Sequence, residues 1–120
     1  MTKGYEEERY SRCPIAYAME IVGSKWKMPI LWNLTQEDSL HYNELRRRMP
    51  SITNTALTRA LRDLERDGLV TRHSAGSVPP SVTYALTDVG AELVPSLDGL
   101  YAWGERHLKE QLGSEGAEGA

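Results

Sequence analysis

The sequence predicts a mainly α-helical fold with a small β-wing. Within residues 42–86, apolar residues recur with helical spacing over 42–49 and again over 54–67. Two short segments with strand character follow, at 69–74 and 81–86, and a Gly/Pro-rich turn joins them. Helix, turn, helix, strand, turn, strand is the order of elements in a winged helix-turn-helix, whose second helix enters the DNA major groove.

The boundaries of the second helix are marked by capping residues. Thr53 is placed to accept hydrogen bonds from the first backbone N–H groups, and Gly68 provides a left-handed cap at the other end. Positions 57, 61 and 64 are leucines that share one face of the helix, which predicts a buried face, and Ala60 allows the preceding helix to approach closely. A short third strand is expected at 39–41, beside the wing.

The opposite face of this helix carries hydrogen-bonding side chains. Asn54, Thr55, Thr58 and Arg59 lie toward its N-terminal end, where recognition helices present the residues that contact bases. Asn54 is a candidate to pair with adenine and Arg59 with guanine, while the threonines suit a base edge or a thymine methyl. Arg62 lies further back and is expected at a phosphate.

Other arginines surround this helix. Arg46, Arg47 and Arg48 belong to the preceding helix, which normally crosses the DNA backbone; since neighbours are about 100° apart, only one or two should reach phosphate. Arg72, at the base of the wing, is a candidate for a minor-groove or phosphate contact. For Arg66 we expect instead an ion pair within the helix, with one of its acidic neighbours, Asp63 or Asp67.

Charge is distributed unevenly along the 120 residues. Residues 41–72 carry seven arginines against four acidic residues, a net +3, although the whole chain has net charge −3. Salt screens the interaction between charges that lie more than about 8–10 Å apart, so attraction to phosphate depends on the charge nearby. A locally basic segment is therefore compatible with DNA binding. The length fits one domain, and the sequence has no membrane span, no signal-peptide pattern and a single cysteine. We therefore expect a cytoplasmic protein without internal disulfides.

The segment before the helix-turn-helix predicts two more helices. The first runs over 14–22, with Pro14 in its first turn and Gly23 at its end. Ser24 is expected to cap the second, 25–34, and Pro29 to bend it. Residues 1–12 are expected to form a flexible arm, 13–112 the domain, and 113–120 a disordered tail.

A long helix is predicted at the C-terminal end of the domain, from the cap Thr87 to about residue 111, with a kink at Pro95. No remaining sequence is available to cover its apolar residues, so dimerisation is favoured over packing on its own domain. The candidate interface residues are Tyr17, Leu97, Leu100, Tyr101, Trp103 and Leu108.

Other functions explain the sequence less well. The three histidines lie in different elements without the spacing of metal ligands or of a catalytic pair, so no enzyme, metal or cofactor is predicted. A winged helix that binds protein would show apolar anchors where this one shows Asn, Thr and Arg. A small-molecule effector between the dimer helices stays open, although aromatic residues at such spacings more often form plain core. Its pocket would be lined by Tyr17, Met19, Trp26, Trp32, Tyr101 and Trp103.

Several stretches together resemble the HxlR-type winged-helix regulators, relatives of the MarR group. The likeness covers about residues 13–108, and no single motif decides it, but the ordered set is specific. The matching residues are Cys13-Pro14, Gly23-Ser24-Lys25-Trp26-Lys27, Ile30-Leu31-Trp32, Tyr42-Asn43-Glu44-Leu45-Arg46-Arg47, Ile52-Thr53, the run from Leu57 to Val70, Val78-Pro79-Pro80, Val82, Tyr84, Leu86-Thr87, Gly90 and Trp103-Gly104.

The resemblance implies a homodimeric bacterial regulator on a palindromic operator, with an interface built from the first and last helices. In some members a cysteine directly before a proline near the N-terminus senses oxidants, and Cys13 occupies that position; the alternative is a small buried hydrophobic residue. The chain departs from the family pattern at Ser81, where a basic residue commonly follows the Pro-Pro of the wing, which implies a weaker wing contact with phosphate.

Overall fold

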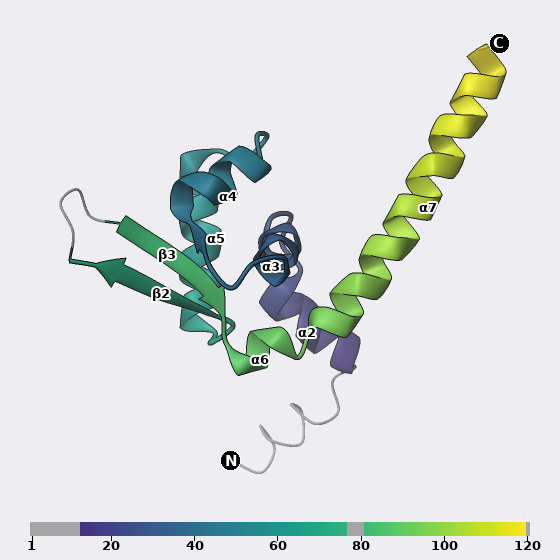
Figure 1. Cartoon of the computed structure of the whole chain (residues 1–120). Coiled ribbons are helices and arrows are strands. Elements are labelled where there is room, and N and C mark those ends of the chain that lie inside the picture. The colour runs from purple at the N-terminus through teal and green to yellow at the C-terminus, as the bar shows by residue number, and fades with distance from the viewer. Residues whose placement is uncertain (1–12, 77–80, 120) are drawn as a thin grey trace.

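The computed structural model describes residues 13–76 and 81–119, and for residues 114–119 the backbone only. Helices pack against one end of a small antiparallel sheet with the strand order β1-β3-β2, and the other end of β2 and β3 projects away from them (Figure 1). The elements are α2 (Pro14–Val22), α3 (Lys27–Thr35), β1 (Leu40–His41), α4 (Tyr42–Arg48), α5 (Asn54–Arg66), β2 (Val70–Ala75), β3 (Ser81–Leu86), α6 (Asp88–Ala91) and α7 (Val94–Gly119).

The predicted fold class, a winged helix-turn-helix, is confirmed. The predicted helices at 14–22, 42–49 and 54–67 appear within one residue of their expected ends as α2, α4 and α5. The strand pair of the wing is β2 and β3, in register from Val70↔Leu86 to Ala75↔Ser81. The expected third strand is the short β1, which pairs with β3 through Leu40↔Tyr84.

The core lies where α3, α4 and α5 meet the sheet. Its fully buried members come from all of these elements, so the three helices and the sheet share one apolar centre. They are Ile30, Leu31, Leu34, Leu40, Leu45, Leu57, Leu61, Leu64 and Val70. Strand β2 is buried only at Val70 and exposed from Thr71 to Ser74, because the wing extends beyond the core.

The start of α3 differs from the prediction. The helix begins at Lys27 with Trp26 as its N-cap and without a side-chain cap, so Ser24 does not cap it. Pro29 therefore lies in the first turn, where a backbone N–H has no partner within the helix. Ile30 N–H, donating to the Trp26 carbonyl at 3.1 Å, forms the first bond, and Pro29 removes none.

The predicted C-terminal helix is two helices. Thr87 caps the short α6 through the Gly90 N–H at 3.0 Å, as expected, but the helix stops at Ala91 and α7 begins at Val94. Pro95 then occupies the first turn of α7, where proline is tolerated, instead of kinking a continuous helix. The backbone of α7 continues to Gly119, past the expected end near residue 111. The predicted arm at 1–12 lies outside the described residues.

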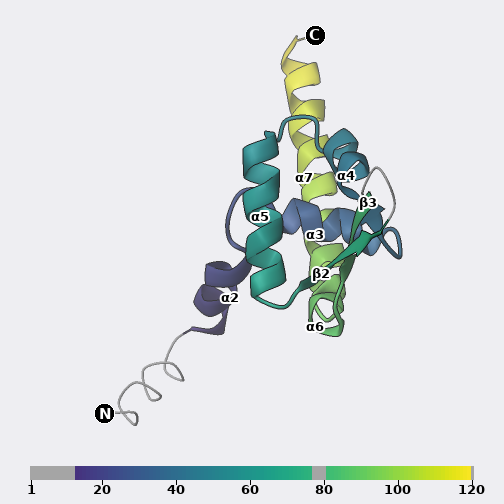
Figure 2. The ribbon, with the colours of Figure 1, turned by 90° about the vertical axis from the view of Figure 1, so that its left-hand side faces the viewer.

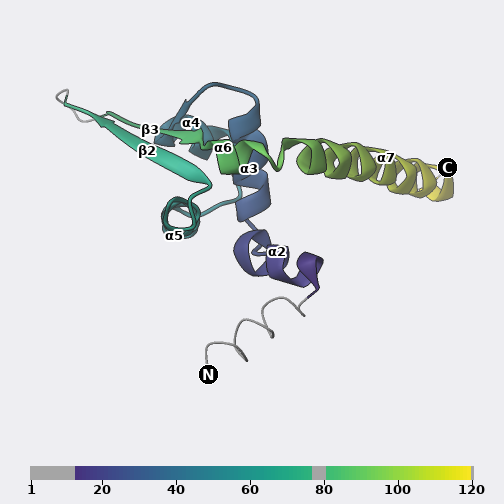
Figure 3. The same ribbon diagram turned by 90° about the horizontal axis from the view of Figure 1, so that it is seen from below.

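The wing and α7 project from opposite sides of the domain (Figures 1 and 3). The start of α7 is attached to the body: Leu97 is 6% exposed in the core, and the rings of Tyr101 and Trp32 of α3 stack with centroids 4.4 Å apart. Within the described part of the chain, none of the helices combines the length and hydrophobicity that crossing a bilayer requires.

Candidate nucleic-acid interface

The exposed face of α5 forms the centre of the candidate interface, and Figure 2 views the molecule with α5 in front. Leu57, Leu61 and Leu64 bury the opposite face as predicted. Thr53 caps the helix by accepting from the Ala56 N–H at 3.1 Å, and Gly68, at φ 81°, ends it in the left-handed region. Because both ends and the apolar face are fixed, the side chains that face solvent have a defined direction.

A shallow groove follows this exposed face. It brings together all five α5 residues that the sequence assigned to DNA contact, with Asp63 and Arg66 at its end; the five are Asn54, Thr55, Thr58, Arg59 and Arg62. Thr58 is partly buried and the other four are exposed. Arg59 and Arg62 have no ion-pair partner among the described residues, so their guanidinium groups are available to an anionic ligand.

A hydrogen-bond network joins α4 to the first turn of α5. Arg46 donates through Nη1 to the Asn54 side-chain oxygen Oδ1. The Tyr42 hydroxyl lies 3.2 Å from the same Oδ1, 3.3 Å from the Asn54 carbonyl and 3.2 Å from Thr58 Oγ1. Three of the candidate residues, Arg46, Asn54 and Thr58, are therefore held in one network centred on Tyr42.

A second groove lies between α4 and the wing. Arg47 of α4 and Arg72 of β2 line it, together with polar groups that include Asn43 and Ser81. Both arginines are exposed and have no acidic partner in the described part of the chain. Arg72 also lines a smaller hollow with Arg62 and the acidic Glu65, so Arg72 links the α5 side of this surface to the groove that Arg47 lines.

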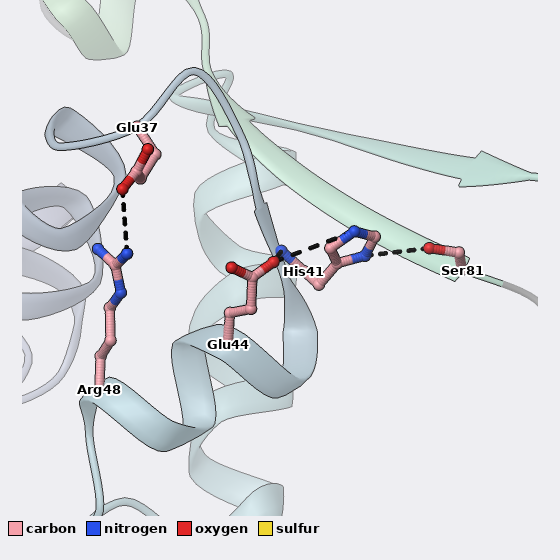
Figure 4. A network of polar contacts seen from close by, with 5 residues as sticks. All are labelled: Glu37, His41, Glu44, Arg48 and Ser81. Atoms are coloured by element: carbon pink, nitrogen blue, oxygen red, sulfur yellow. Dashed lines mark hydrogen bonds and ion pairs between the residues drawn. The ribbon is translucent and has the colours of Figure 1, made fainter.

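Two of the arginines are held by acidic neighbours. Arg66 pairs with Asp63 at 3.2 Å and with Asp67 at 3.5 Å, which confirms the predicted ion pair within the helix. Arg48 donates to Glu37 at 3.2 Å, across from α4 to the loop before β1 (Figure 4). The 46–48 trio therefore takes three directions, since Arg46 bonds Asn54, Arg47 lines the groove and Arg48 pairs with Glu37, as expected when neighbours on a helix cannot all face one way.

His41 connects the base of the wing to α4. Its Nδ1 lies 3.0 Å from the Ser81 hydroxyl of β3, and its Nε2 lies 4.0 Å from Glu44 (Figure 4). Glu44 also accepts from the His41 backbone N–H at 3.1 Å. Ser81, which departs from the basic residue expected in that place, therefore has a structural partner inside the protein.

A largely buried lysine supports α5 from behind. Lys27 is 8% exposed, and its Nζ lies 3.5 Å from Asp63 Oδ2, so the ion pair joins the start of α3 to α5. An ammonium group is seldom buried without a partner, because its desolvation is costly. The pair therefore fixes how α5 is seated on the core, with its polar face outward.

The predicted dimer residues divide into two sets. Tyr17, Leu100, Tyr101, Trp103 and Leu108 are about half exposed or more, along with Ile15 and Met19 on α2 and Leu112 on α7. Leu97 differs, because the core of its own chain buries it, and it is not available to a partner. The ring stack of Trp32 on Tyr101 likewise occupies two residues assigned to an effector pocket.

Cys13 is exposed and immediately precedes α2. Hydrogen bonds from the backbone N–H groups of Ala16 and Ile15 lower the pKa of its thiol, because they stabilise the thiolate. The alternative interpretation, a small buried hydrophobic residue, does not describe Cys13 in the single chain. In the described residues no three metal-binding side chains come together.

The polar role of Tyr42 and the roles of Lys27 and His41 were not predicted from the sequence. Tyr42 is only partly buried, and its ring packs on the core while its hydroxyl reaches residues 12 and 16 positions away. Contacts over such separations have no local signal in a single sequence.

Comparison with known proteins gives a consistent result. The family model of HxlR-like helix-turn-helix proteins matches residues 21–112. The chain belongs to this family. Its HxlR-like relatives include the HTH-type transcriptional regulators YdzF of Bacillus subtilis, 40% identical over 80% of this chain and 88% of YdzF, and YtcD of the same species, 40% identical over 90% and 84%.

Solved structures support the same family assignment. The oxidised form of the redox regulator HypR superposes with a TM-score of 0.74 at 39% identity, covering 78% of this chain and 96% of HypR. This HxlR-like chain is accordingly a DNA-binding transcriptional regulator of the winged helix-turn-helix type.

Proposed function

We propose that the protein binds a palindromic operator as a homodimer, with α5 in the major groove. The observation that carries this is the division of α5 into a fully buried leucine face and an exposed face of Asn, Thr and Arg. In this arrangement Asn54, Thr55, Thr58 and Arg59 meet base edges. Arg47, Arg62 and Arg72 neutralise phosphates beside these contacts, from the hollows that they line.

A protein partner is a weaker explanation of the same face. Protein-binding helices present large apolar anchors, and the groove along α5 has none among its seven lining residues. We also infer that the chain acts by binding and not by catalysis, without a metal or cofactor, in the cytoplasm where the chromosome lies.

The homodimer is supported by the exposed apolar residues of α2 and α7. A second copy would cover Ile15, Tyr17, Leu100, Trp103 and Leu108, each about half exposed or more in one chain. A two-fold symmetric pair presents two α5 helices, as a palindrome requires.

Replacing Arg59 with alanine tests the contact with bases. We expect Arg59→Ala to weaken binding to a duplex selected from a random library by about 1–3 kcal/mol more than binding to random DNA. Arg66→Ala is the matched control, since Asp63 and Asp67 already hold Arg66, and it should change the ratio of the two affinities little. An equal loss on both duplexes for Arg59→Ala would make Arg59 a phosphate contact instead.

An oxidant-responsive version of this function is favoured by Cys13. Its thiol is exposed and has a lowered pKa, so it is a thiolate at lower pH than an ordinary cysteine. Oxidation removes two electrons and two protons from the Cys13 thiols of two subunits, or from Cys13 and a small thiol, and forms one disulfide while the oxidant is reduced.

The rate of iodoacetamide labelling as a function of pH measures this property. The folded protein should reach its plateau at lower pH than the same protein unfolded in urea, where Cys13 loses the backbone donors. Coincident curves would remove Cys13 from the mechanism. Diamide should also release DNA from the wild type and not from Cys13→Ser.

A small-molecule effector remains a proposal as well. An apolar hollow between α2, α6 and the start of β2 offers it a place, lined in part by Tyr17, Ile21, Leu69 and Leu93. Binding there would act on α2 and α6 and, through the start of β2, on the wing.

A further inference from the structure

Asn54 has a fixed orientation that limits which bases it can contact. Arginine nitrogens only donate hydrogen bonds, so the Asn54 atom facing Arg46 Nη1 must be the amide oxygen. The amide nitrogen Nδ2 consequently points away from Arg46. This assignment follows from the chemistry of the partner, whereas an isolated amide could be turned either way.

The direction of the remaining hydrogen bonds in the network follows in the same way. Both Asn54 oxygens near the Tyr42 hydroxyl can only accept, so Tyr42 gives its single proton to Asn54. Tyr42 must then accept the proton of the Thr58 hydroxyl, 3.2 Å away. Thr58 donates to Tyr42, Tyr42 donates to Asn54, and Arg46 donates to Asn54.

Arg46 donates to Oδ1, and the single Tyr42 proton is shared between Oδ1 and the Asn54 carbonyl, so donors of the protein already engage this oxygen. A bidentate contact with adenine needs Oδ1 to accept from the adenine N6 amino group while Nδ2 donates to N7. Within this network the two Nδ2 donors are the Asn54 groups that no protein partner engages, and they are what Asn54 offers to a ligand. The adenine pairing that the sequence predicts would therefore require Arg46 and Tyr42 to release the side chain.

We propose that Asn54 acts as a donor-only reader that selects a base with a carbonyl oxygen in the major groove, guanine or thymine, over adenine and cytosine. Guanine offers O6 and N7 and thymine offers O4 as acceptors. Adenine has an amino group beside its one acceptor N7, and cytosine presents an amino group there, so both place a donor opposite the Nδ2 donors of Asn54. Arg46 and Tyr42 are positioning residues for this contact. The inference rests on the proposed placement of α5 in the major groove.

The test is selection of binding sites from a randomised duplex library by the full-length protein and its variants. The position contacted by Asn54 is the one whose base preference disappears in Asn54→Ala. We expect the wild type to favour guanine or thymine there over adenine by about tenfold. Asn33→Ala is the matched control, since Asn33 lies on α3 and donates to the Pro29 carbonyl, and it should leave every preference unchanged.

The double variant Arg46→Met/Tyr42→Phe separates positioning from stability. It frees Oδ1, so adenine should rise at that one position, even if the overall affinity falls because a cation is lost. A ratio of bases at one position does not respond to a uniform loss of affinity, and circular dichroism confirms that the variant is folded.

Three results would overturn the proposal. In the first, the wild type favours adenine at the Asn54 position. In the second, Asn54→Ala alters no position, and in the third, the folded double variant shows no gain of adenine. If the wild type selects no sequence at all, both the proposed function and this inference fail. If it selects a palindrome and Asn54→Ala selects the same one, this inference alone fails.

Discussion

The two helices α5 and α7 use their apolar residues in opposite ways. In α5 the leucines at 57, 61 and 64 are at most 1% exposed, and what remains outside is polar and basic. In α7 the residues beyond the first turns remain uncovered: Trp103 is 56% and Leu108 is 59% exposed. The single chain buries the leucine face of α5 but leaves the apolar residues beyond the first turns of α7 exposed. This difference supports the proposal that α5 contacts DNA and that α7 contacts another copy of the chain.

The largest expected effect comes from placing charge on the uncovered part of α7. Leu100→Asp/Leu108→Asp should weaken self-association by about a hundredfold or more, because a dimer would have to bury the new carboxylates. Sedimentation velocity should then show the 13.5 kDa monomer, and binding to a palindromic duplex should fall with it. Circular dichroism should show retained helix.

Gln111→Asp is the control on the same helix, since it adds a carboxylate at an exposed polar position. It should leave the dimer intact. If the wild type itself sediments as a monomer at micromolar concentration, the assignment of α7 to a subunit interface is incorrect.

A smaller effect should distinguish the two ends of α7. In the monomeric Leu100→Asp/Leu108→Asp background, adding Leu97→Ala should lower the free energy of unfolding by about 2–4 kcal/mol, because Leu97 is buried in the core. Leu112→Ala, at 57% exposure, should change it by less than about 0.5 kcal/mol. Urea titration measures both, and equal losses would mean that the far end of α7 folds back on its own domain.

The smallest effect concerns the end of α5. Thr53→Ala removes the acceptor for the Ala56 N–H and should cost about 1 kcal/mol of unfolding free energy. Thr55 lies two residues further along and is exposed, so Thr55→Ala should alter the free energy of unfolding by less than about 0.5 kcal/mol. A loss for Thr55→Ala as large as for Thr53→Ala would show that the threonine hydroxyl at 53 is not what fixes the start of the recognition helix.

Local patterns predicted most of the fold well. The leucine spacing and the two caps of α5, the ends of α2 and the strand pair of the wing all depend on residues close in sequence. The errors at Ser24, Pro29 and Pro95 share one cause: each helix begins two or more residues later than propensity indicates, and its proline then lies in the first turn.

The candidate site was predicted as a list of residues and not as an arrangement. The α5 residues share a groove because one helix face presents them, which periodicity alone can show. The sequence did not show that Arg48 pairs with Glu37 or that Arg47 and Arg72 line one groove. It also did not show that Tyr42 and Arg46 form hydrogen bonds with Asn54. These pairings join separate elements.

The sequence by itself determined the order of elements, the basic character of the helix-turn-helix and the identity of its outward face, since these follow from spacing along one chain. Only the tertiary structure decided which polar atoms remain free, because a hydrogen-bonding group already paired with a neighbour cannot offer the same lone pair or proton to a ligand. It also decided where the core ends on α7, since burial depends on how helices far apart in sequence pack together.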